Sequence, residues 1–220
     1  MPTETPLHAR PINSFEGWEK KFHPTAEIAY SNQPPGDNLP FMQVCEWTDE
    51  LGRKQSRVHI VHGAFPIALH HETHEVFVIK VGGRYVGGEQ GVADSYEIPG
   101  GRVLRGESPL LTAIRQAREE ACVEAVDTNP ETAWIPVYQE GGVHPLNGPV
   151  VTDQYAFLCL AAKQVGTPKD RGEYIRSVST MPFSKLLEMD ADGQFPEPMV
   201  GYKLWRVQNW LRKNRPDLLT

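Results

Sequence analysis

The stretch of sequence that most restricts the fold is residues 101–125, GRVLRGESPLLTAIRQAREEACVEA. Apolar residues recur there at i, i+4, i+7 and i+11, which is the spacing of one face of a helix; they are Leu110, Ile114, Ala117 and Ala121. Ser108 and Pro109 form a typical helix start, because serine can cap the first turn and proline fits the first helical position. Strand-like patterns lie on both sides, so the chain has to combine an amphipathic helix with a sheet.

The rest of the chain reads mainly as strands. We expect a hairpin at residues 42–48 and 56–61, further strands at 65–69, 75–80, 133–139, 153–160 and 175–179, and loops at Gly82, Gly83, Gly87 and Gly88. A short helix is expected at 182–189 and a final helix at 199–213, with Val200, Leu204, Val207 and Leu211 on one face. This order predicts an α/β protein of the α+β kind, with helices packed on the faces of a mixed sheet.

Charge and composition exclude several classes of protein. The formal net charge of -6 argues against a nucleic-acid backbone or an anionic membrane as the main partner. The three cysteines are far apart in sequence and form no C-x-x-C pair, which fits a reducing compartment. No stretch approaches 18 apolar residues, and the first residues show no apolar leader. We therefore expect a cytoplasmic protein.

A second face of the helix carries polar side chains. Gln116, Glu119 and Glu120 lie at i, i+3 and i+4, so their side chains project together. Neighbouring carboxylates repel each other, and a hard cation turns that repulsion into binding, since Mg²⁺ takes carboxylate oxygens at about 2.1 Å. Arg115 can orient one carboxylate, and Glu107, before the helix, can reach the same cation. Taken alone, the sequence REE also fits an exposed acidic helix face.

The spacing of these residues resembles the Nudix box. That box reads Gly, five residues, Glu, seven residues, Arg-Glu, an aliphatic residue, any residue, Glu-Glu, any residue, Gly and an aliphatic residue. The chain matches it in register at Gly101, Glu107, Arg115, Ala117, Glu119, Glu120 and Val123. At residue frequencies of about 6–7%, the five strongly specified positions coincide by chance at roughly one start in a million. The preceding EIPG sequence strengthens this resemblance to the Nudix superfamily.

The box departs from the family pattern at two positions. Cys122 replaces the late glycine, and we expect this change to be mild provided that the backbone there does not need a positive φ. Gln116 replaces a glutamate that the family commonly uses as a metal ligand. Its amide oxygen can still coordinate a cation, but it is neutral and cannot act as a base. A natural divergence and a deliberate isosteric substitution both fit this residue.

Beyond the box, the order of segments over most of residues 40–213 resembles the ADP-ribose pyrophosphatase branch. The resemblance implies a Nudix fold, in which a mixed sheet is sandwiched between helices. It also implies a small N-terminal β region at residues 1–62, a Nudix domain at residues 63–220, and a homodimer. The reaction implied is hydrolysis of a nucleoside diphosphate linked to another moiety, such as ADP-ribose or a nucleotide sugar, with Mg²⁺ or, in its place, Mn²⁺.

The same resemblance assigns the site residues. The metal ligands that it implies are the Gly100 carbonyl, Glu107, Gln116, Glu119 and Glu120. The catalytic group that it implies is Arg115, Gln116, Glu119, Glu120 and the loop acid Glu173, while Arg84 contacts phosphate. A solvated arginine and a surface acid are the alternatives for Arg84 and Glu173. A Nudix-fold protein that binds a nucleotide-like ligand without hydrolysing it, or that catalyses another reaction, is the alternative function, and Gln116 favours it.

Three other patterns carry less information. The HHETHE sequence at residues 70–75 lacks the spacing of a zinc-binding helix and fits a polar hairpin turn. Cys45 and Cys159 have no local support as nucleophiles, so we expect both in the interior of strands. Trp205 and Trp210 fit the packing of the last helix rather than the stacking of a base.

Overall fold

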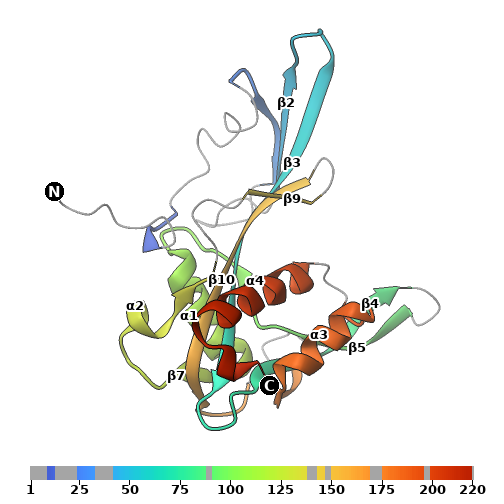
Figure 1. Cartoon of the computed structure of the whole chain (residues 1–220). Helices are drawn as coiled ribbons and strands as arrows, with labels where there is room; N and C mark the ends of the chain where they lie inside the picture. Colours follow the sequence, from blue (N-terminus) through green and yellow to red (C-terminus); the bar gives the residue numbers. More distant parts are fainter. Residues whose placement is uncertain are drawn as a thin grey trace, which may run out of the picture. The chain divides into compact units, whose positions relative to one another are not determined.

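The structure is a computed structural model that describes residues 9–12, 24–32, 42–87, 91–137, 143–146, 150–168, 175–195 and 199–219. The chain forms two compact units (Figure 1). Unit 1 comprises residues 1–64, 101–112 and 139–155, and unit 2 comprises residues 65–100, 113–138 and 156–220. No helix in the described part of the chain is long and apolar enough to cross a membrane.

Unit 1 is built on the predicted hairpin. Strand β2 (Met42–Thr48) has the predicted bounds, and it pairs antiparallel with the first half of β3 (Lys54–His70). Strand β1 (Glu27–Asn32) pairs with β2, and β6 (Gly101–Arg102) pairs with β3 at residues 63–64. Strand β9 (Val143–Leu146) pairs with the start of β10 (Val150–Gln164).

Strand β3 corrects one prediction, because it is a single strand of 17 residues rather than two. Its first half bonds to β2 as far as Ile60, and its next residues bond to β6 at Gly63 and Ala64. The change of neighbour keeps the backbone groups paired, so the chain does not need a turn between residues 61 and 65.

Unit 2 has β4 (Val76–Gly87) between β11 (Ile175–Met181) and β5 (Gly91–Glu97), with the end of β3 beside it. The second half of β10 pairs with β7 (Val123–Ala125) and β8 (Ile135–Pro136). The helices are α1 (Pro109–Ala121), α2 (Pro130–Ala133), α3 (Phe183–Ala191) and α4 (Met199–Asn214), followed by the 3₁₀ turn η4 (Pro216–Leu218). The predicted helices and the α+β class are confirmed.

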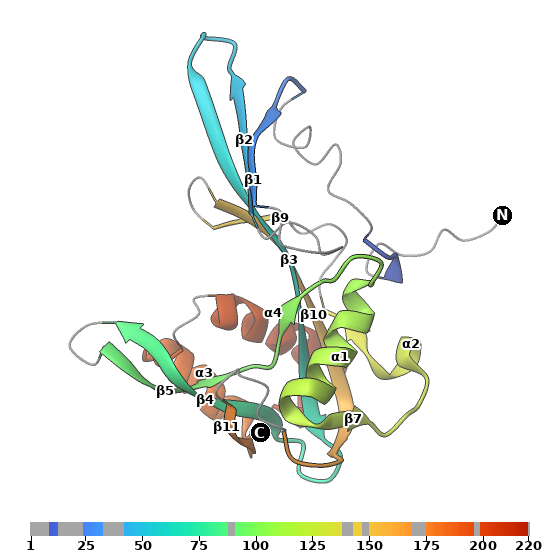
Figure 2. The ribbon, with the colours of Figure 1, turned by 180° about the vertical axis from the view of Figure 1, so that it is seen from behind.

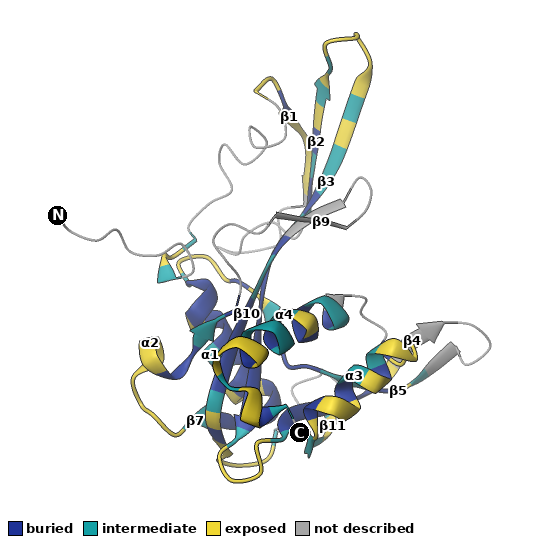
Figure 3. Ribbon diagram, in the orientation of Figure 1, coloured by how far each residue is buried: buried dark blue, intermediate teal, exposed yellow. Residues whose placement is uncertain are grey.

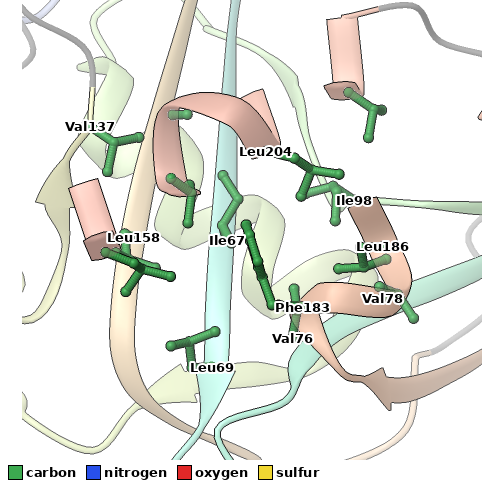
Figure 4. Packing of buried hydrophobic residues seen from close by; sticks show 14 of the residues in the cluster. Ile67, Leu69, Val76, Val78, Ile98, Val137, Leu158, Phe183, Leu186 and Leu204 are labelled. Carbon is green, nitrogen blue, oxygen red and sulfur yellow. The ribbon is translucent and has the colours of Figure 1, made fainter. Parts of the chain in front are cut away.

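The helices cover both faces of the sheet in unit 2. Figures 1 and 2, which view the chain from opposite sides, show α1 on one face of β3 and β10 and α4 on the other. The core lies between the sheet and α3 and α4, where Ile67, Val78, Leu158, Leu186 and Leu204 are each at most 4% exposed (Figures 3 and 4). Burial of this kind is worth about 25 cal/mol per Å² of apolar surface.

Two further predictions of local structure are wrong. The loop expected at Gly82, Gly83 and Gly87 is instead the second half of β4, and the register shift between Val81 and Arg84 places the first two glycines in a bulge. Gly83 has φ +73 there, which glycine adopts at little cost. Gly88 lies outside the described residues.

The other error is the strand expected at residues 133–139. Ala133 is the last residue of helix α2, and only Ile135–Pro136 form a strand. The side chain of Asn129 accepts the N–H of Glu131, and Pro130 occupies the first helical turn. These two residues are a helix-start signal that competes with the strand pattern after it. Residues 138 and 139 lie outside the described part.

The minor patterns behave mostly as expected. The HHETHE sequence forms the turn between β3 and β4, where the His70 N–H donates to the Glu75 carbonyl and the His74 N–H donates to the His70 carbonyl. Cys45 and Cys159 are each 1% exposed within strands. Trp210 packs against the core. Trp205 is 49% exposed and stacks on Tyr202, so its predicted role in packing is wrong.

Candidate active site

Helix α1 begins and packs as its sequence predicts. The Ser108 hydroxyl oxygen accepts the N–H of Leu111 at 3.2 Å, which caps the first turn. Of the predicted apolar stripe, Leu110, Ala117 and Ala121 are at most 6% exposed, and Ile114 is half-buried. The packing of this stripe fixes which way the polar side chains of the helix point.

The end of α1 differs from the expectation for Cys122. This residue follows the last helical residue and has φ +50, in the left-handed region that glycine adopts easily. The backbone is held there, because the Cys122 carbonyl accepts the N–H of Val165 at 2.7 Å. The condition under which the change from glycine would be mild is therefore not met, and Cys122 occupies a strained position.

Glu120 is fixed by the main chain that precedes the Nudix-like box. Its Oε2 accepts the N–H of Gly100 at 2.8 Å, and the residue is only 8% exposed. A charge-assisted bond of this length holds the carboxylate in one orientation. The loop residue and the helix residue, 20 positions apart in sequence, are thus brought together in unit 2.

Arg115 joins two other predicted site residues. Its Nη1 donates to Oε1 of Gln116 at 3.0 Å and to Oε2 of Glu119 at 3.1 Å. Gln116 is 7% exposed, so this amide is buried and not part of an open helix face as predicted. Glu119 remains exposed. The arginine therefore orients the amide and one carboxylate at the same time.

Glu107 lies in unit 1, in the loop before α1. Its Oε2 accepts the hydroxyl of Thr112 at 2.7 Å and the N–H of Leu104 at 3.4 Å. Its main chain forms a bridge with Ile12. These contacts hold the glutamate to its own loop and to the first helical turn.

The remaining predicted site residues are less defined. Arg84 lies in β4 opposite Ala93, so it belongs to a strand and not to a loop. Glu173 lies outside the described residues. Cys159 offers no nucleophile in their place, because burial raises the pKa of its thiol to about 11 and keeps it protonated near neutral pH.

The donor atoms on α1 and beside it suit a hard cation. Two carboxylates, the amide oxygen of Gln116 and the Gly100 carbonyl are oxygen donors of the kind that Mg²⁺ takes. Within the described ranges, no three or more His, Cys, Asp or Glu side chains converge as a metal-holding group. A cation here would therefore depend on neutral oxygens, water or substrate oxygens as well as on carboxylates.

Sequence reasoning missed two features of this region. The spacing of the box suggested the carbonyl of Gly100 as a ligand but not the role of its N–H toward Glu120. It also missed Lys203, which is 0% exposed in α4. The signal for this burial was present, because Lys203 lies three residues after Val200 and four before Val207, on the apolar face of the helix.

A large sheet covered by helices, one of which carries the paired carboxylates Glu119 and Glu120, is the arrangement expected of the class of Nudix-type pyrophosphohydrolases. The family model of the NUDIX domain matches residues 61–200 of this chain. The chain therefore belongs to the Nudix family, and it is a hydrolase that acts on diphosphate bonds.

Comparison with solved structures supports the same fold. The crystal structure of an ADP compounds hydrolase is similar with a TM-score of 0.59 and 12% sequence identity, and the alignment covers 87% of this chain and 94% of that one. At this identity the similarity establishes the fold. Comparison with curated protein sequences found no match.

Proposed function

We propose that this Nudix hydrolase is Mg²⁺-dependent and cleaves the diphosphate of a nucleoside diphosphate linked to a second moiety, such as ADP-ribose or a nucleotide sugar. The observation that carries this proposal is the bond of 2.8 Å between the Gly100 N–H and Glu120, which fixes a box carboxylate beside the loop that opens the box. The fold shared with an ADP compounds hydrolase supports an ADP-containing substrate.

The residues present fit this cation. Glu119, Glu120, Gln116 and the Gly100 carbonyl would hold it, with Mn²⁺ as the alternative ion. Bound there, it would neutralise the diphosphate and lower the pKa of a coordinated water. Arg115 keeps the Glu119 carboxylate oriented through its bond of 3.1 Å. Glu120 cannot turn away without losing the Gly100 N–H.

Gln116 determines where a proton can go. An amide oxygen is not basic, so the proton lost by the attacking water has to pass to a carboxylate. We assign this role to Glu173, the loop acid that the resemblance to the ADP-ribose pyrophosphatase branch implies. We assign Arg84 to a phosphate of the substrate, because a guanidinium binds two phosphate oxygens at once.

The test is an assay of nucleoside monophosphate formation from a panel of nucleoside diphosphate compounds with Mg²⁺, because cleavage of the diphosphate gives a nucleoside monophosphate and the phosphorylated second moiety. The wild type is expected to cleave at least one of them, Gln116→Glu to cleave it about tenfold faster, and Glu120→Gln to lose activity by about 100-fold. Glu124→Gln is the matched control, because Glu124 pairs with Arg118 at 3.1 Å and is not a box carboxylate. It is expected to retain wild-type activity.

The same panel addresses the second candidate function. The specific observation in favour of a site that binds a ligand without hydrolysis is Gln116 itself, because its neutral amide replaces the family's glutamate and cannot act as a base. If neither the wild type nor Gln116→Glu cleaves any compound while both bind one by calorimetry, this second function replaces the first.

The ADP-ribose pyrophosphatase resemblance also supports three statements about the whole protein. We propose a homodimer, a cytoplasmic location, and an N-terminal region of residues 1–62 that precedes a Nudix domain of residues 63–220. Light scattering on the eluting protein tests the first, since a dimer doubles the mass of 24.7 kDa.

A further inference from the structure

The most unusual buried side chain in unit 2 is Lys203. It is 0% exposed and lies in α4 between the core residues Val200, Leu204 and Val207. A lysine is almost never fully buried without a favourable contact, because removing an ammonium from water is costly. An apolar residue of the same length would fill this space at a lower cost. Packing therefore does not explain why a charge stands here.

The ammonium of Lys203 contacts the ring of Phe65. Its Nζ lies 3.0 Å from the ring centroid, and Phe65 is itself only 9% exposed. A cation over an aromatic face is attracted by the ring quadrupole, and the attraction is strongest where water is excluded. The contact therefore fixes the plane and position of the Phe65 ring.

The Phe65 ring in turn lies against Gly100. A Cβ placed on Gly100 would overlap Cδ1 of this ring, so only a hydrogen fits between the loop and the aromatic edge. The backbone of Gly100 is thus held from one side by Phe65. From its nitrogen it donates to Oε2 of Glu120 at 2.8 Å. Four residues of unit 2, from α4, β3, the loop before β6 and α1, form one continuous path of contacts.

From this path we infer that Lys203 is a positioning residue of the hydrolase site. It acts through Phe65, which restricts Gly100 so that its N–H stays directed at Glu120. It does not touch the substrate, since it is completely buried. The catalytic effect that we infer for Lys203 rests on the proposed function. The path of contacts from Lys203 to Glu120 does not depend on it.

The variant Lys203→Met tests this role, because methionine has a similar length and no charge. We expect it to fold with a melting temperature at or above that of the wild type, since a buried charge is replaced by an apolar group. We expect amide hydrogen exchange at Gly100 to become about tenfold faster and the Kd for Mn²⁺ to rise about tenfold. The kcat is expected to fall by a similar factor, with KM within about twofold.

Two further variants separate positioning from general loosening. Phe65→Leu is expected to reproduce the faster exchange at Gly100, and the double variant to show no additional effect, because both changes interrupt the same path. Leu211→Ala is the control, since it removes packing from α4 at a residue that is 0% exposed. It is expected to lower stability while leaving exchange at Gly100 unchanged.

Unchanged exchange at Gly100 and unchanged Mn²⁺ affinity in Lys203→Met would overturn the inference. Equal acceleration in Leu211→Ala would overturn it as well, because any loss of packing would then have the same effect. A wild type that cleaves no diphosphate compound would instead refute the proposed function. Hydrogen exchange at Gly100 would still decide whether Lys203 orders the loop.

Discussion

The strained backbone at Cys122 leads to a prediction about stability. A residue with a Cβ pays about 1–2 kcal/mol for the left-handed region, whereas glycine pays almost nothing there. Cys122 has φ +50, so Cys122→Gly removes this cost. Glycine also gives the unfolded chain more freedom, which costs about 0.5–1 kcal/mol. We therefore expect a net stabilisation of about 0.5–1 kcal/mol.

This gain can be measured by thermal and urea unfolding. For a chain of this size, 1 kcal/mol corresponds to about 2–4 °C in melting temperature, so Cys122→Gly is expected to melt roughly 2–3 °C higher. Cys122→Ala is the matched control, because it removes the same thiol but keeps the Cβ. It is expected to gain nothing. If the glycine variant is no more stable than the alanine variant, the backbone conformation is not a source of strain and the reasoning fails.

Two further predictions concern Gly100 and Cys159. Gly100→Ala is expected to lower the free energy of unfolding by about 1–3 kcal/mol, because its Cβ would overlap the Phe65 ring. Gly166→Ala is the control and should be neutral, since a Cβ there meets no atom closer than 3.9 Å. Equal urea midpoints for the two variants would contradict this prediction. Burial raises the pKa of Cys159 from 9.0 to about 11, so its contribution to stability is complete below pH 9 and is lost as the pH rises toward 11. Urea unfolding across this window should show the wild type losing up to about 1.4 kcal/mol per pH unit more than Cys159→Ala, and parallel curves would refute it.

The elements that the sequence predicts best are those with a long, regular pattern. Helix α4 was expected at residues 199–213 and spans Met199–Asn214, and β2 has the predicted bounds. In each, the apolar period is repeated often enough to identify the element and its buried face without knowledge of its neighbours.

Two of the elements predicted wrongly, β3 and β4, depend on partners distant in sequence. Strand β3 continues past Gly63 because β6, about 40 residues later, bonds to it there. Strand β4 continues through Gly82 and Gly83 because a bulge preserves its pairing with β5. Glycine is a turn signal locally, but strand pairing outweighs that signal, and the pairing is not visible in a single sequence.

In the candidate site, too, local spacing predicts some features, whereas others depend on partners distant in sequence. The register of the box was enough to name Glu119, Glu120 and Arg115, since helical spacing fixes which side chains share a face. The contact between Gly100 and Glu120 depends on how a loop closes over the helix. The contact of Lys203 with Phe65 depends on how α4 crosses the sheet. Neither arrangement follows from local spacing.

For Gln116, the sequence shows an amide where the family has a glutamate, and the structure shows which hydrogen bond that amide makes. Its Oε1 accepts a bond of 3.0 Å from Arg115, which a glutamate oxygen at the same position would accept equally well. The amide therefore keeps the hydrogen-bonding arrangement of the site and removes one negative charge from it. For this reason Gln116→Glu changes electrostatics far more than structure, and any difference in cation affinity or turnover between it and the wild type reports the missing charge.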